Sequence, residues 1–215
     1  MNDWTNTLSS RMSLRAPQRE SLEILDRLSE LLTLKKDVDL KSALEVIQTE
    51  YPQFADFERD FPCFCFALAT GVGKTRLMGA FIAFLHFTKG IRNFFILAPN
   101  LTVYNKLVTD FTPGTQKYVF AGIDTFLSNP PTIITGDNYE SMVGTLFDDP
   151  EQVEINIFNV SKITAKDKGH LAGDDQKASL PRFRRLSEYI GKSYFDYLAA
   201  KDDLVLLMDE SHHYR

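Results

Sequence analysis

The chain has little cysteine, no long apolar run and no excess of positive charge. Only Cys63 and Cys65 occur among its 215 residues, so the sequence excludes a disulfide framework and favours a reducing compartment. No segment reaches the roughly 20 consecutive apolar residues that cross a bilayer, and the N-terminus lacks the apolar core of a signal peptide. A net charge of -5 argues against a free-standing basic domain that coats nucleic acid. These absences predict a soluble cytoplasmic protein that is not attached to a membrane.

The apolar content is sufficient for a folded core. Apolar residues make up 44% of the chain and include 17 Phe, which excludes disorder of the whole chain. Residues 1–60 form a helical segment that leads into the core, since leucines recur at helical spacing over 17–34 and a second helix is expected over 39–49. The remaining residues, 61–215, are expected to form one larger domain.

Strand-like and helical patterns alternate through this larger region. Residues 63–68 form a continuous apolar run that predicts a strand buried on both faces, and the helix expected over 74–88 is apolar on all sides. A surface loop is expected at 161–180 and a helix from Pro181. Further strands are expected at 93–97, 118–123, 132–135, 153–158 and 204–208, with a helix at 101–111. This alternation predicts an α/β fold with a mostly parallel sheet, helices on both faces and N-terminal helices before it.

A glycine-containing loop lies between the first expected strand and its helix. Glycines let several backbone N–H groups approach a phosphate closely, and the helix N-terminus beneath them favours negative charge. Lys74 would then reach the β and γ phosphates of a nucleotide, and the Thr75 hydroxyl would bind magnesium. Leu68 stands where the strict phosphate-loop pattern has its first glycine, but the flanking strand and helix favour nucleotide binding over a chance match. The candidate nucleotide-binding residues here are Thr70, Gly71, Val72, Gly73, Lys74, Thr75 and Arg76.

Two carboxylates follow the last expected strand. Hydrolysis of ATP requires one carboxylate for the magnesium shell and another that orients and deprotonates water. Asp209 and Glu210 are the candidates for these two roles, with Asp209 acting on the metal through water. A solvated strand end is the ordinary interpretation of an isolated Asp-Glu pair, but the phosphate loop in the same chain favours the catalytic one. The candidate catalytic residues are thus Lys74, Asp209 and Glu210, and the candidate metal ligands are Thr75 and Asp209.

Two other groups of side chains leave alternatives open. The aromatic residues Tyr189, Tyr194, Phe195 and Tyr197 could stack on bases, although their helical spacing favours core packing. No histidine stands at zinc-finger spacing from the two cysteines, so no structural metal is expected. Basic residues could contact nucleic-acid phosphates, although a solvated helix face is the favoured interpretation; they are Lys162, Lys166, Lys168, Lys177, Arg182, Arg184 and Arg185.

Together these motifs resemble the DExH-box helicases of superfamily 2, and most closely the helicase subunit of type III restriction enzymes. Residues 66–75 (FALATGVGKT) are similar to the first helicase motif, and residues 209–212 (DESH) to motif II. Residues 96–100 (ILAPN) resemble motif Ia, and residues 156–162 (NIFNVSK) motif Ib. Residues 14–20 (LRAPQRE) resemble the segment whose glutamine reads adenine, which implies that Gln18 contacts the base.

The resemblance implies the ATP- and Mg²⁺-dependent motor domain of a DNA helicase or translocase for antiviral restriction. Its implied partners are duplex DNA, a second RecA-like domain and a methyltransferase subunit. The chain stops three residues beyond motif II, so it is expected to be the first, P-loop RecA-like domain alone. Without the arginine of a second domain, hydrolysis should fall by roughly 10³ or more. A motor that acts on RNA, or a nucleotide-binding module without motor activity, are the alternatives.

Overall fold

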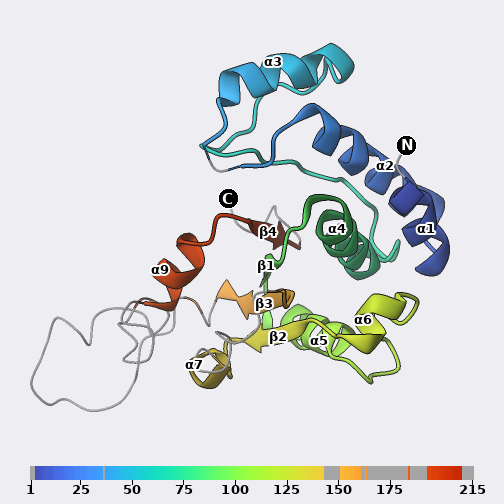
Figure 1. Cartoon of the computed structure of the whole chain (residues 1–215), viewed down its shortest axis with the longest axis vertical. Coiled ribbons are helices and arrows are strands. Elements are labelled where there is room, and N and C mark those ends of the chain that lie inside the picture. The colour runs from blue at the N-terminus through green and yellow to red at the C-terminus, as the bar shows by residue number, and fades with distance from the viewer. Residues whose placement is uncertain are drawn as a thin grey trace, which may run out of the picture. The chain divides into compact units, whose positions relative to one another are not determined.

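The computed structural model describes residues 3–35, 37–142, 151–160, 163, 184 and 193–209. The chain divides into two compact units, Met1–Gly90 and Ile91–Arg215, and each is described by itself (Figure 1). The sequence-based boundary at residue 60 falls inside the first unit, and the extent of the ATP-binding domain stays a prediction. No helix in the described ranges is long and apolar enough to cross a membrane.

The described part of the first unit contains four helices: α1 Asp3–Arg11, α2 Ala16–Leu31, α3 Leu40–Glu50 and α4 Lys74–Lys89. The expected leucine stripe of α2 is buried, which confirms that helix. In α4 every residue from Leu77 to Leu85 is buried, and both α1 and α2 pack against it. Helix α4 is therefore the core of this unit, as its apolar sequence predicts. Helix α1 was not predicted from the sequence, because most of its residues are polar and its buried stripe, which includes Leu8, is short.

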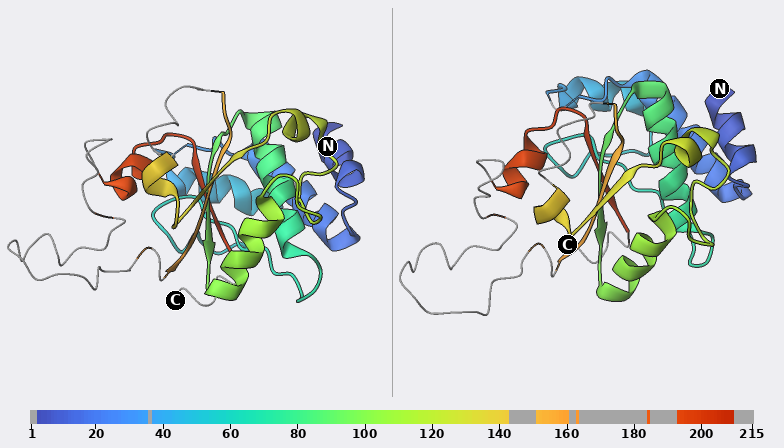
Figure 2. Two further views of the ribbon diagram at one scale, coloured as in Figure 1. Left: turned by 90° about the horizontal axis from the view of Figure 1, so that it is seen from below. Right: turned by 60° about the horizontal axis from the view of Figure 1, so that its bottom comes forward.

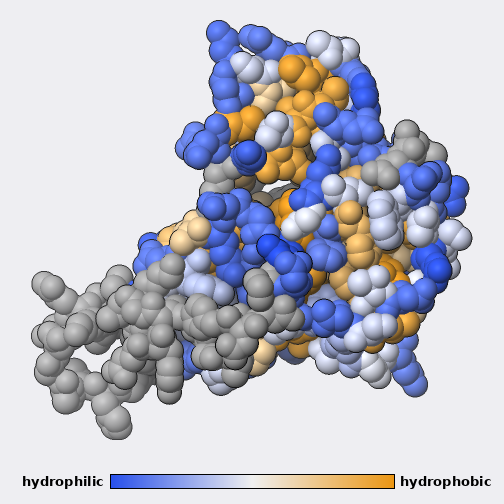
Figure 3. Space-filling model, in the orientation of Figure 1, coloured by the Kyte–Doolittle hydropathy of each residue, from blue (hydrophilic) through white to orange (hydrophobic). Residues whose placement is uncertain are grey.

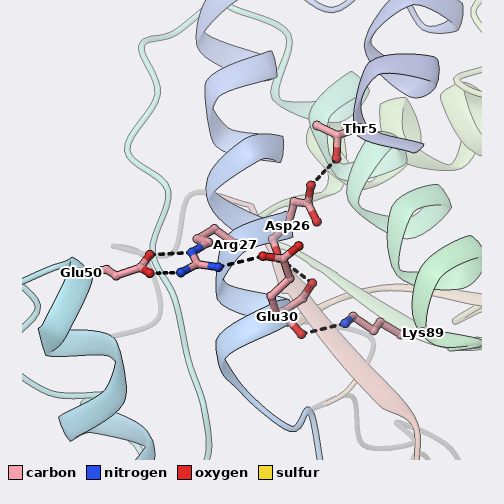
Figure 4. A network of polar contacts seen from close by, with 7 residues as sticks. Thr5, Asp26, Arg27, Glu30, Glu50 and Lys89 are labelled. Carbon is pink, nitrogen blue, oxygen red and sulfur yellow. Dashed lines mark hydrogen bonds and ion pairs between the residues drawn. The ribbon is translucent and has the colours of Figure 1, made fainter. Parts of the chain in front are cut away.

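Polar contacts join the helices of the first unit (Figure 4). The Thr5 hydroxyl of α1 donates to the buried Asp26 of α2 at 2.8 Å. Arg27 of α2 donates to Glu50 of α3 at 2.7 Å between Nε and Oε2. At the end of α4, Lys89 donates to the backbone carbonyl of Ser29 at 2.7 Å. These contacts hold α1, α3 and α4 to α2.

The strand expected at residues 63–68 is not formed, and this prediction was wrong. The backbone there is irregular, Cys65 is exposed, and Phe64 and Phe66 are only half-buried. Phe64 packs against Phe54 and Phe57, and Phe66 packs against Phe81 of α4 with ring centres 4.9 Å apart. Figure 3 shows apolar side chains gathered over α2 and α3 of this unit. A strand needs a hydrogen-bonding partner strand, whereas Phe64 and Phe66 of this apolar run pack against aromatic rings.

The second unit is built on a parallel sheet with the strand order β2-β3-β1-β4 (Figure 2). Its strands are β1 Asn93–Ala98, β2 Thr132–Thr135, β3 Glu154–Asn159 and β4 Leu204–Met208. Ala98 lies opposite Asn159, and Leu97 lies opposite Met208. The carboxyl ends of these strands therefore meet at one edge of the sheet, where ligands bind in such folds.

Helices cover both faces of this sheet. Helix α5 Leu101–Phe111 packs against β1, β2 and β3. Helices α7 Tyr139–Met142 and α9 Tyr194–Ala199 lie on the other face, where Tyr194 and Leu198 pack with Phe95 and Phe158. This arrangement confirms the α/β fold, with a parallel sheet between helices. It also confirms core packing for Tyr194, which is 2% exposed.

A second strand prediction, at residues 118–123, was also wrong. Backbone bonds from Ala121 to Tyr118 and from Ile123 to Phe120 form turns that lead into α6 Asp124–Ser128. Tyr118, Phe120 and Ile123 are buried, and Phe120 packs edge-to-face against the rings of Tyr118 and Phe126, without strand pairing. The loop expected at 161–180 lies outside the described residues except for Ile163. Of the helix expected from Pro181, the described residues are Arg184 and the stretch from Ser193 onward, where α9 begins at Tyr194.

Candidate nucleotide-binding site

The loop before α4 has the backbone geometry that its glycines predict. Gly71 and Gly73 lie in the left-handed region with φ of 82° and 97°, where a residue with a Cβ is strained. Gly73 is the N-cap of α4, and its carbonyl accepts from the N–H groups of Arg76 and Leu77 at 3.0 and 3.2 Å. Lys74 is thus the first residue of the helix, followed by Thr75. The positive end of a sixteen-residue helix lies directly behind the loop, as anion binding requires.

Gln18 lies against the back of this loop, within the same unit. Its Nε2 donates to the carbonyl of Gly73 at 2.8 Å, and its Oε1 accepts from the backbone N–H of Arg15 at 2.7 Å. The side chain is 1% exposed. The structure thus places Gln18 beside the phosphate loop, whereas the contact with adenine stays a prediction.

Two arginines add outer contacts to the loop. Arg15 Nη1 donates to the carbonyl of Gly71 at 3.2 Å, and Arg76 Nη1 donates to the carbonyl of Ser13 at 3.4 Å. Arg15 was not predicted as a site residue, because its only signal in the sequence is its position three residues before Gln18 in the segment 14–20. Arg76 is exposed, and its predicted contact with nucleotide stays a prediction.

In the second unit, Asp209 follows β4 at the carboxyl edge of the sheet. Its backbone N–H donates to the carbonyl of Leu97 at 3.3 Å, which extends the β1–β4 pairing by one residue. Its side-chain Oδ1 is buried and has no hydrogen-bond partner among the described residues. A buried carboxylate oxygen is costly unless a donor or a cation satisfies it. Mg²⁺ prefers oxygen ligands and retains several waters, so the chemistry of Asp209 fits the metal role predicted for it. Glu210, Ser211 and His212 lie outside the described residues.

Other polar residues follow the neighbouring strands at the same edge. Asn100, at the end of the motif Ia segment, caps α5 by accepting from the N–H of Val103 at 3.0 Å. Asn159, in the motif Ib segment, is 3% exposed at the end of β3. The motif Ia segment, and the described part of the motif Ib segment, therefore lie at the edge where motif II begins.

The loop after β2 was not predicted as part of the site, and its signal in the sequence is a Gly-Asp-Asn run after a short strand. Asn138 Oδ1 accepts from the backbone N–H of Thr135 at 2.6 Å. The hydroxyl of Tyr104 donates to Asp137 at 3.0 Å, and burial raises the pKa of Tyr104. This loop is thus held by its own side chains at the same edge of the sheet as Asp209.

The structure groups the predicted site residues by unit. Gln18 and the run from Thr70 to Arg76 belong to the first unit, and Asp209 belongs to the second. Of the basic residues considered for nucleic-acid contact, only Arg184 lies in the described part, with its guanidinium 4.7 Å from the ring centre of Phe195.

Comparison with known protein families supports the interpretation drawn from the motifs. Residues 11–215 match the family described as type III restriction enzyme, res subunit. No curated protein and no solved structure matches the chain significantly. The matched residues include the phosphate loop, the strands of the parallel sheet and Asp209. A parallel sheet with helices around it is consistent with a RecA-like P-loop domain. The chain therefore belongs to the type III restriction enzyme res subunit family, of which it carries the helicase-like motor domain.

Proposed function

We propose that this chain binds ATP with Mg²⁺ and forms one half of a motor that moves along duplex DNA. The observation that carries the proposal is the loop before α4. Two left-handed glycines bring the N-terminus of a long helix, Lys74 and Thr75 to one place. Triphosphates bind where backbone N–H groups, a helix N-terminus and a lysine converge.

Each residue has a defined part in this proposal. The loop and the N-terminus of α4 bind the phosphates, and the ammonium group of Lys74 stabilises negative charge on the β and γ oxygens. Thr75 and Asp209 would hold Mg²⁺, which when bound neutralises phosphate charge. The role of Asp209 is supported by its side-chain Oδ1, which is buried and has no hydrogen-bond partner among the described residues. Glu210 would orient the attacking water and accept its proton.

The proposal extends to partners and location. Efficient turnover would require a second RecA-like domain that supplies an arginine to the transferring phosphate. A methyltransferase subunit and duplex DNA are the partners proposed for the complete enzyme, which would act in the cytoplasm. Efficient hydrolysis by this chain alone is not expected, but nucleotide binding is.

Nucleotide binding is tested by titrating ATP into the chain with Mg²⁺ and with EDTA. Lys74→Ala should weaken binding roughly 10- to 100-fold, because it removes a charged hydrogen-bond donor to the phosphates. Lys41→Ala, which removes a lysine from α3 instead, is the matched control and should bind as the wild type does. Equal affinities of all three proteins would refute the assignment of the phosphate loop.

The substrate is tested by measuring the slow ATPase rate with duplex DNA, single-stranded DNA and RNA. Stimulation by duplex DNA above the other two supports the proposed motor. Stronger stimulation by RNA would replace it with a motor that acts on RNA. Nucleotide binding with no response to any nucleic acid, even after a second RecA-like domain is added, would leave a nucleotide-binding module without motor activity.

A further inference from the structure

We propose that Asn138 caps the outer edge of β2 and thereby keeps this chain from pairing with a second copy of itself. In the described sheet β2 is the outermost strand, and its neighbour on the inner side is β3 (Figure 1). The backbone groups on the outer side of such a strand are a template for pairing with another chain. This inference concerns self-association and is independent of nucleotide binding.

The first argument is which backbone groups of β2 face outward. The N–H of Thr132 donates to the carbonyl of Val153 at 2.8 Å, in the register of the β2–β3 pairing, so Thr132 faces β3. Neighbouring residues of a strand direct their N–H and C=O groups to opposite sides. Ile134 therefore also faces β3, whereas Ile133 and Thr135 face away from it. The outer edge of β2 thus presents the backbone groups of Ile133 and Thr135.

The second argument is that Asn138 binds three of these outward groups. Its Oδ1 accepts from the N–H of Thr135 at 2.6 Å, and its Nδ2 donates to the carbonyl of Ile133 at 3.3 Å. Its backbone N–H donates to the carbonyl of Thr135 at 3.2 Å. A residue in a neighbouring parallel strand likewise accepts from one residue and donates to the residue two positions before it. The side-chain amide of Asn138 therefore makes the two hydrogen bonds that an added strand would make.

The third argument is that Asn138 is held in this place by α7, which begins directly after it. Its backbone carbonyl accepts from the N–H groups of Ser141 and Met142 at 3.1 and 3.0 Å. The hydroxyl of Thr135 also donates to its Oδ1 at 3.1 Å. The main chain of Asn138 thus starts α7 while its side chain turns back to β2. An added strand would have to displace a side chain that is already ordered.

The sequence of β2 indicates that a second copy is the partner this edge fits. Its residues, Thr132–Thr135, are all β-branched, which favours strand pairing, and none is charged, so none repels the same edge of another copy. Two identical edges can pair about a twofold axis. At the amino end of β2 the chain has Pro130 and Pro131, and proline is typical of edges that avoid pairing. Asn138 gives the carboxyl end an equivalent protection.

Sedimentation velocity over a range of protein concentrations tests the cap. For Asn138→Ala the average mass should rise roughly twofold with concentration, because a closed pair forms, whereas the wild type should not respond to concentration. The matched control is Asn100→Ala, which removes another bond from an Asn side chain to a backbone N–H, that of Val103, and leaves β2 capped. It should sediment as the wild type does. Unchanged sedimentation of Asn138→Ala would overturn the proposal, as would equal association of both variants.

A second substitution tests where the association occurs. Ile133→Pro removes an outward N–H that an added strand would use, and it costs the β2–β3 pairing no hydrogen bond because Ile133 faces away from β3. In the Asn138→Ala background it should restore sedimentation that is independent of concentration. Association that persists in the double variant does not involve the edge of β2 and contradicts the proposal.

Hydrogen exchange in dilute protein tests the cap without association. The Thr135 amide should exchange roughly tenfold faster in Asn138→Ala, because its acceptor is removed. Asn138→Asp keeps this acceptor and adds a charge to the edge, so it should retain slow exchange and should not associate. If Asn138→Ala does not fold, Asn138→Asp decides alone: fast exchange at Thr135, or association of this charged variant, rejects the cap.

Discussion

Replacing Gly73 with alanine tests the geometry of the phosphate loop most directly. An alanine in the left-handed region costs about 1–2 kcal/mol, and the added Cβ would lie 2.7 Å from Gln18 Nε2. The amide must then move away, and the loss of its bond to Gly73 adds about 1–3 kcal/mol. We expect Gly73→Ala to lower the free energy of unfolding by about 2–5 kcal/mol.

Gly90, at the other end of α4, provides the matched control. It is also left-handed, with φ of 68°, but no atom lies within 4 Å of a Cβ added there. Gly90→Ala should therefore cost only the backbone term of about 1–2 kcal/mol. In a Gln18→Ala background the excess cost at Gly73 should disappear, since the side chain that collides is gone.

The assay is urea unfolding followed by tryptophan fluorescence. Trp4 is the only tryptophan of the chain, and it stacks on Phe87 of α4 with ring centres 4.4 Å apart. Its emission thus reports on the unit that contains both glycines. The prediction is refuted if Gly73→Ala and Gly90→Ala lower the free energy of unfolding equally. It is also refuted if Gly73→Ala remains the more destabilising of the two in the Gln18→Ala background.

Three further predictions concern the second unit. In Asp209→Asn, the affinity for ATP should be the same with Mg²⁺ as with EDTA, and the affinity with EDTA should equal that of the wild type. If a calorimetric titration shows that Mg²⁺ raises the ATP affinity of the variant as much as that of the wild type, Asp209 is excluded as a metal ligand. Burial raises the pKa of Tyr118 to about 12, above its ordinary value, so its contribution to stability should be complete below pH ~10 and be lost as pH rises toward ~12. Tyr118→Phe should make alkaline unfolding less steep in that window, and an identical pH profile would contradict this. Tyr194→Phe should lower the free energy of unfolding by about 1–3 kcal/mol, because it leaves the buried Asn156 oxygen without its donor; chemical unfolding that is unchanged would show the bond to be unimportant.

Segments whose pattern is local were predictable. The leucine stripe of α2, the apolar helix α4 and the strands β1 to β4 all follow from spacing and run length within a few neighbouring residues. The runs at 63–68 and 118–123 have the same apolar character as strands. Their backbones differ from strands because their aromatic rings pack against other rings and no strand pairs with them. An apolar run alone does not determine whether it will pair with a strand or pack against side chains.

The sequence by itself determined the phosphate loop, the family and the α/β class, because glycine spacing, Lys74 and alternating apolar runs are readable along the chain. Only the tertiary structure decided the strand order β2-β3-β1-β4, the contact of Gln18 with Gly73 and the burial of Asp209 Oδ1 without a described partner. Each of these depends on residues far apart in the chain that packing brings together. The spacing of neighbouring residues does not specify contacts between distant residues, so these contacts could not be predicted from local patterns.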